Sequence, residues 1–445
     1  MKNFLVPLYS LLLLNSFFKI LPFLTSENQP FIILLAFLFS FTYFLSSNLR
    51  SSLFFISKNS QYLILIPPLI TIFLFGVNNI TVSFYSLLVY FQIPLYLFST
   101  IYLFSKSINR KLFINWFFKW LYILLPISLI LNLLGISISG ISGNRGSLVR
   151  GGGFPLYTSE PSALVGLSLS LTTLYILMSE LNLNDLYGVK KSRILILISF
   201  IFIASRSAAV VIYSIGLFIL YFIYIILLNA YKRGFIVNSI KVNKKRIKLI
   251  SIFIFIFVVS NIIFPEISNY FMRFRPIYVI SDFFNSGLSA LFLQASFRPS
   301  FAFASFLPDS LINFFFGHGL DHWYGNYLEK TFEAASILGQ NTTAFPRLLN
   351  ERRLMSIRPP TVLGFVFYSY GLLGLYTLFN TIGAFWNIKN ISFLSKFKRK
   401  SLKILFFFLF TYTILCPGLA FNPLLFSIFP FSLITLYYSY EMKFD

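Results

Sequence analysis

The chain has 445 residues, of which 57% are hydrophobic and 11% charged, and phenylalanine alone occurs 59 times. So much apolar surface excludes a soluble globular domain and indicates an integral membrane protein. The single cysteine, Cys416, excludes an intramolecular disulfide and a cysteine-based metal cluster, and two histidines leave little scope for a histidine-rich metal site. The net charge of +23 occurs in short clusters between apolar runs, which is typical of topology signals and not of nucleic-acid binding.

Apolar runs with the character of membrane-spanning helices recur along the whole chain. The first follows Lys2 and has no A-x-A-type cleavage site, so we expect a retained span and not a cleaved signal peptide. We place twelve runs at 4–24, 30–47, 62–77, 80–104, 116–138, 162–179, 193–205, 208–228, 249–264, 361–386, 403–419 and 424–440. The pattern predicts an all-α integral membrane protein with about 12 transmembrane helices.

Basic clusters orient these predicted spans. With Lys2 inside, every Lys-rich cluster falls in an inner loop, as the positive-inside rule requires. The inner loops are then 48–61, 105–115, 180–192, 229–248 and 387–402, and both termini are cytoplasmic. The long segment 265–360 becomes one large outer loop with short helices, between spans 1–264 and 361–445.

The fifth and sixth runs are joined by a loop, 139–161, that is rich in glycine. It carries Arg145 and Arg150 and ends in Glu160-Pro161, where the next helix is expected to begin. Free N–H groups at a helix start attract anions, and two guanidinium groups nearby suit phosphate. The loop therefore indicates a phosphate site at the outer surface; a disordered loop with lipid-facing arginines is the competing interpretation.

The break between the seventh and eighth runs is Ser205-Arg206-Ser207, which contains no glycine or proline. Three polar residues are too few for an external loop, so we expect Arg206 at or just inside the outer membrane boundary. A charge at that depth usually faces a cavity or a partner. The alternative is that its side chain snorkels to the interface.

Arginine strongly dominates the basic residues of the predicted outer face. Ten of the eleven are arginine, whereas lysine prevails inside. Topology requires only positive charge, but the planar guanidinium binds phosphate or carboxylate with two hydrogen bonds. This bias predicts an anionic ligand outside, unless the arginines merely pair with outer acids. The eleven are Arg145, Arg150, Arg206, Arg273, Arg275, Arg298, Lys330, Arg347, Arg352, Arg353 and Arg358.

The large outer loop holds a short predicted helix at 309–316, bounded by Pro308 and Gly317. Arg298 lies before it, in FRPSFAF, and GHGLDHWYGN follows. Aromatic rings beside histidine and aspartate suit sugar binding, and a loop this long can act as a lid. Structural hydrogen bonding of the histidines is the equal alternative. The candidate residues here are His318, Asp321, His322, Trp323 and Tyr324, with Arg352, Arg353 and Arg358 in NERRLMSIRPP.

Several segments, taken in order, resemble the O-antigen polymerases of bacterial inner membranes and the related O-antigen ligases. They are GGGFPLYTSEPSA opening a helix, the SRS break, RPSFAFASFLPDSLINFFFGHGLDHW, and the Gly-rich GFVFYSYGLLGLY. The likeness covers most of the chain, including the large loop between spans nine and ten. No single motif carries it.

The resemblance implies a membrane glycosyltransferase that polymerises undecaprenyl-pyrophosphate-linked repeat units for lipopolysaccharide at the periplasmic face, without a cofactor or catalytic metal. Membrane lipids and a chain-length regulator are the implied partners, and nucleic acid is not.

The resemblance also implies roles for individual residues. Pyrophosphate binding is implied for Arg145, Arg150, Arg206 and Arg298. Catalytic roles fall to Glu160, His318, His322 and Asp321, with the choice of base open between the histidines. Trp323, Tyr324, Arg352, Arg353 and Arg358 would bind substrate. A ligase and a lipid-linked glycan flippase or transporter are the alternatives.

Overall fold

The computed structural model is mostly helical and describes eight stretches of the chain. These are residues 63–91, 107–134, 164–180, 183–205, 208–232, 298–339, 359–386 and 396–415, with the isolated residues 7, 10 and 156. Within them, three helices are long and apolar enough to cross a membrane, at Lys111–Leu133, Val210–Leu228 and Val362–Asn380. The chain is therefore an integral membrane protein, as its composition predicts; twelve spans remain a prediction.

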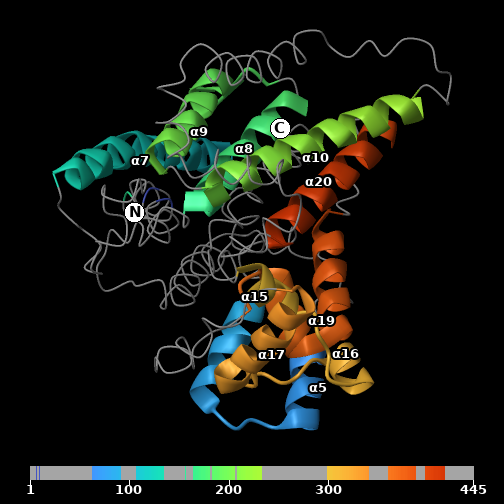
Figure 1. The fold of residues 1–445 in the computed structure, drawn as a ribbon. Helices are drawn as coiled ribbons and strands as arrows, with labels where there is room; N and C mark the ends of the chain where they lie inside the picture. The colour runs from blue at the N-terminus through green and yellow to red at the C-terminus, as the bar shows by residue number, and fades with distance from the viewer. Residues whose placement is uncertain are drawn as a thin grey trace.

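One group of helices forms the upper part of Figure 1 and centres on α8 (Val165–Glu180). Nearly every side chain of α8 is buried, because α9 (Lys191–Ser205) and α10 (Ala208–Lys232) pack against it. Small polar residues let the helices approach, and the Oγ atoms of Ser168 and Ser214 are 2.7 Å apart. The group also includes α7 (Ser107–Leu133) and α20 (Lys396–Leu415).

A tight hairpin connects α8 to α9. Its strands, β1 (Asp185–Leu186) and β2 (Val189–Lys190), pair antiparallel across Tyr187 and Gly188. Both turn residues have positive φ, 53° and 91°, which matches the twist of a two-residue hairpin. The following break at Ser205-Arg206-Ser207 coincides with the end of α9 and the start of α10.

The second group, at the bottom of Figure 1, surrounds the first half of α19 (Val362–Trp386). It contains α5 (Ile66–Phe75) and the helix Ile80–Phe91 from early in the chain. The loop helices α15 (Arg298–Ala304), α16 (Leu311–Phe316) and α17 (Trp323–Ile337) complete it. Residues 361–370 are all buried by these neighbours. The helix predicted at 309–316 is confirmed as α16, which begins later because Ser310 caps it, accepting a hydrogen bond from Asn313 N.

Two glycines allow α16 and α19 to meet backbone to backbone. Gly317 ends α16 with φ 80°, and Gly371 interrupts α19 with φ 63°. A Cβ on Gly317 would lie 2.3 Å from the backbone carbon of Ser369, and one on Gly371 would lie 2.5 Å from that of Phe315. This close approach lets His318 N donate a hydrogen bond of 2.8 Å to Tyr368 O.

We expect Gly317→Ala to destabilise the second group of helices strongly. Its φ of 80° and ψ of −171° belong to a region that essentially only glycine occupies, which costs about 1–3 kcal/mol for another residue. The clash with α19 adds to this penalty. Thermal unfolding in detergent measures the loss, with Gly339→Ala as the matched control. Gly339 has a φ of 66° but open space around it, so an equal loss in both variants would contradict the steric argument.

Candidate functional site

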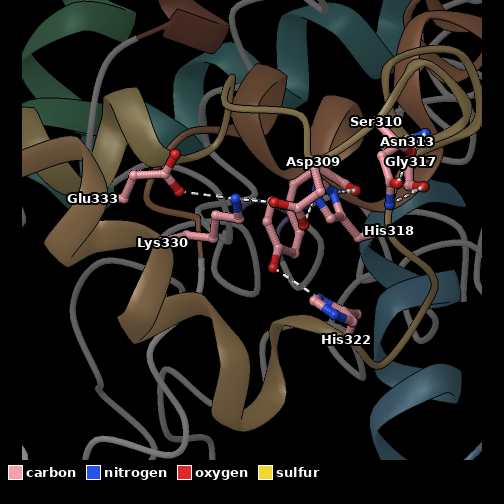
Figure 2. A network of polar contacts seen from close by, with 9 residues as sticks. Asp309, Ser310, Asn313, Gly317, His318, His322, Lys330 and Glu333 are labelled. Atoms are coloured by element: carbon pink, nitrogen blue, oxygen red, sulfur yellow. Dashed lines mark hydrogen bonds and ion pairs between the residues drawn. The ribbon is translucent and has the colours of Figure 1, made fainter. Parts of the chain in front are cut away.

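Two of the predicted site residues, His318 and His322 (Figure 2), both contact Tyr368 of α19. The connection between α16 and α17 carries both histidines, and their ring centroids are 5.4 Å apart. The ring of Tyr368 stacks on His318 at 4.4 Å and 12°. Its hydroxyl oxygen is 2.9 Å from His322 Nδ1. One tyrosine therefore contacts both histidines through different parts of its side chain.

His318 is the inner residue of the pair and is only 5% exposed. Its Nδ1 lies 3.3 Å from Tyr368 O, and its Nε2 lies 3.1 Å from Asp309 Oδ2. Burial lowers the pKa of His318 below its usual value, although the carbonyl of Tyr368 and the carboxylate of Asp309 act in the opposite direction. A side chain so enclosed, with one ring N–H to donate to either Tyr368 O or Asp309 Oδ2, is suited to holding the loop and not to meeting a substrate.

Asp309 continues this network to the surface of α17. Lys330 Nζ contacts Asp309 Oδ1 and lies 2.9 Å from Glu333 Oε2 (Figure 2). Burial alone would raise the pKa of Asp309, but the hydrogen bond and charge of Lys330, with His318, lower it below its usual value. Burial acts to lower the pKa of Lys330, and its two carboxylate partners outweigh that effect and raise it. The charged forms of Asp309 and Lys330 thus tie the start of α16 to α17.

His322 is the outer residue of the pair and is half-buried. Burial lowers the pKa of His322, with Asp309 and Asp321 opposing the shift, so the ring is neutral at pH 7. In the tautomer that donates Nδ1–H to Tyr368 Oη, Nε2 keeps a free lone pair. The structure gives Nε2 no hydrogen-bond partner among the residues that it describes. His322 is therefore oriented by one nitrogen and can accept a proton at the other.

Asp321 and Trp323 are placed as packing residues. Asp321 Oδ2 accepts hydrogen bonds from Asn78 N at 2.8 Å and Asn79 N at 2.5 Å. The buried indole of Trp323 donates from Nε1 to Ser86 Oγ at 2.8 Å. These contacts join the loop to the helix Ile80–Phe91 and leave neither group facing solvent. Among the predicted sugar-binding rings described here, Tyr324 is the exposed one.

The structure does not describe the side chains of the other predicted site residues. Arg298 is the first residue of α15, of which only the backbone is described. Those outside the described residues are Glu160, Arg145, Arg150, Arg206, Arg352, Arg353 and Arg358. Their roles remain predictions.

Three members of the network were not predicted as site residues: Asp309, Lys330 and Tyr368. The sequence already distinguished Lys330 from its neighbours, because it is the one lysine among the eleven predicted outer basic residues. Asp309 is one of the acids of the predicted outer face, with which the outer arginines could simply pair. Tyr368 lies within an apolar, aromatic helix, so nothing in its local sequence separates it from a packing residue.

The arrangement supplies a neutral imidazole for proton transfer beside an enclosed polar network. In the described stretches, no group of three or more histidine, cysteine, aspartate or glutamate residues is placed to hold a metal ion. The fold and its apolar helices define a mostly helical integral membrane protein. Comparison of the chain with protein-family models, curated protein sequences and solved structures finds no match.

Proposed function

We propose that the chain is a membrane glycosyltransferase that polymerises lipid-linked oligosaccharide repeat units, with undecaprenyl pyrophosphate as the carrier. The observation that carries the proposal is His322, a half-buried imidazole whose Nδ1 lies 2.9 Å from the Tyr368 hydroxyl in a membrane protein. The arginine bias of the predicted outer face supports it, because a pyrophosphate leaving group develops negative charge that arginines stabilise. The order of the sequence segments that resemble O-antigen polymerases is the further support.

In the proposed reaction, a hydroxyl of the acceptor glycan attacks C1 of the donor sugar. His322 Nε2 takes the hydroxyl proton as the new C1–O bond forms. The bond from C1 to the pyrophosphate oxygen breaks, and its electron pair leaves with undecaprenyl pyrophosphate. Arg145, Arg150, Arg206 and Arg298 would hold that group, while His318 and Asp309 position the loop. Glu160, at a helix start, would remain ionised and orient arginines.

A ligase that passes the finished glycan to another acceptor uses the same chemistry and is the close alternative. A flippase or other transporter is expected to place acids or discontinuous helices at mid-membrane depth. The three described candidate spans contain no aspartate or glutamate, which favours the transferase. The interruption of α19 at Gly371, inside the candidate span Val362–Asn380, is a feature that a transporter would share.

A deletion strain separates these functions through the banding pattern of its surface glycan. Loss of a polymerase should leave glycan with a single repeat unit. Loss of a ligase should leave the surface bare and accumulate lipid-linked polymer. Loss of a flippase should accumulate single lipid-linked units on the cytoplasmic side, and that outcome would overturn the proposal.

The proposed location is the bacterial inner membrane, with both termini cytoplasmic and the site periplasmic. The hydrogen bonds from Asn78 and Asn79 to Asp321 support part of this topology. They join two segments that the orientation by basic clusters independently assigns to the same outer side.

Reporter fusions at positions 239 and 330 should therefore report opposite sides of the membrane. Position 239 lies in the most basic predicted inner loop, and Lys330 lies in the large predicted outer loop. Paired phosphatase and fluorescent-protein reporters provide the measurement, since each is active on one side only. Both fusions reporting the same side would contradict the topology.

A further inference from the structure

Helix α16 lies inside the segment predicted as a large extramembrane loop, yet its exposed side chains are apolar. Leu311 is 77% exposed, Ile312 58% and Phe315 47%. No residue from 311 to 316 is charged. An exposed apolar surface rimmed by polar residues is typical of a contact with another molecule or a membrane.

The position of α16 indicates what covers this surface. The helix packs against α5 and against the candidate membrane span in α19. Thr71 Oγ1, from the middle of α5, donates a hydrogen bond of 3.5 Å to Phe316 O. In α5, Phe73 is 88% exposed and Leu69 is exposed as well. The apolar surface of α16 therefore lies beside a predicted span whose exposed side chains are also apolar.

The exposed surface of α17, in the same group of helices, is mostly polar. The exposed residues of α17 include Asn326, Glu329 and Glu333. Lys330 of α17 also pairs with Asp309, which precedes α16. Figure 1 shows α5 and α16 at the same lower end of the group. The group thus has an apolar surface on α5 and α16 and a charged surface on α17.

We propose that α16 is embedded in the membrane leaflet that adjoins this loop, with Leu311, Ile312 and Phe315 against lipid acyl chains. At a rise of about 1.5 Å per residue, six residues extend about 9 Å, so the helix enters one leaflet and does not span. The inference stands on the exposed surface of α16 and its packing against α5 and α19, and it does not depend on the reaction.

Spin-label accessibility tests this placement in the full-length protein. Single cysteines replace Ile312 and Phe315 in a Cys416→Ala background, and Asn326→Cys on α17 is the matched control. The protein is reconstituted in vesicles of synthetic phosphatidylcholine and phosphatidylglycerol that contain no polyprenyl lipid. Oxygen partitions into acyl chains, and a nickel chelate stays in water. Labels at 312 and 315 should collide mainly with oxygen, and the label at 326 mainly with nickel.

Two outcomes would overturn the inference. Nickel accessibility at 312 and 315 equal to that at 326 would place α16 in water. Low accessibility to both reagents would show that protein covers the helix, either a second copy or another part of this chain. Because the vesicles lack polyprenyl lipid, contact with a bound substrate tail cannot produce the expected result. Either labelled position suffices if the other variant does not fold.

Discussion

Replacing His322 with glutamine should lower the rate of glycan elongation by about 10²- to 10⁴-fold, the usual contribution of a general base. Glutamine has a similar size and retains a polar group for the Tyr368 hydroxyl, but it cannot accept the proton of the attacking hydroxyl. The half-buried position of His322 allows the substitution without opening the enclosed network around His318. The measurement is chain elongation from purified lipid-linked repeat units by reconstituted protein at equal protein level.

The pH dependence of the rate identifies the group that is lost. A base works in its neutral form, and burial lowers the pKa of His322 below its ordinary value of 6.5. The wild-type rate should therefore rise as pH increases through a value below 6.5 and level off near neutrality. This acid limb should be absent from the residual rate of the glutamine variant. Unchanged elongation, or the same acid limb in both proteins, would exclude His322 as the base.

Tyr368→Phe is the matched control for this experiment. It keeps the ring that stacks on His318 at 4.4 Å but removes the hydroxyl that holds His322 Nδ1. A hydrogen bond contributes about 0.5–1.5 kcal/mol, so elongation should fall only several-fold. The smaller loss separates orientation of His322 from its chemistry.

Arg206→Lys should lower elongation by about 30- to 10³-fold, or about 2–4 kcal/mol, although it keeps the charge. The substitution removes a planar fork that can donate two hydrogen bonds to a developing phosphate charge. Arg206 itself lies outside the described residues, but α9 ends at the buried Ser205 and α10 begins at Ala208. Both helices pack against α8, so the break is attached to the helical core.

Arg193→Lys is the matched control, because Arg193 lies near the other end of the same helix, α9, toward the predicted inner side. Lysine there should preserve elongation. Glycan chain lengths at equal protein level provide the comparison. Full activity of Arg206→Lys would leave Arg206 a residue that only anchors its helix at the membrane interface.

The predicted elements that the structure describes depend on local signals. The apolar run at 162–179 is α8, Val165–Glu180, because length and hydrophobicity suffice to specify a buried helix. The break after Ser205 and the short helix bounded by Pro308 and Gly317 also match observed helix ends. Each of these features depends on residues that are adjacent in the chain, so the sequence alone can predict where such a helix begins and ends.

Only the tertiary structure decided which polar groups meet. Tyr368 reaches both histidines because Gly371 breaks α19 and Gly317 lets the α16 end approach it, bringing together residues about fifty positions apart. The same packing buries His318 against Asp309 while leaving His322 half-exposed. Hydrophobic periodicity predicts that a segment is a helix, but it does not show which other segments pack against that helix. The choice between two similar histidines therefore depended on burial and hydrogen bonding, which arise only when distant segments pack.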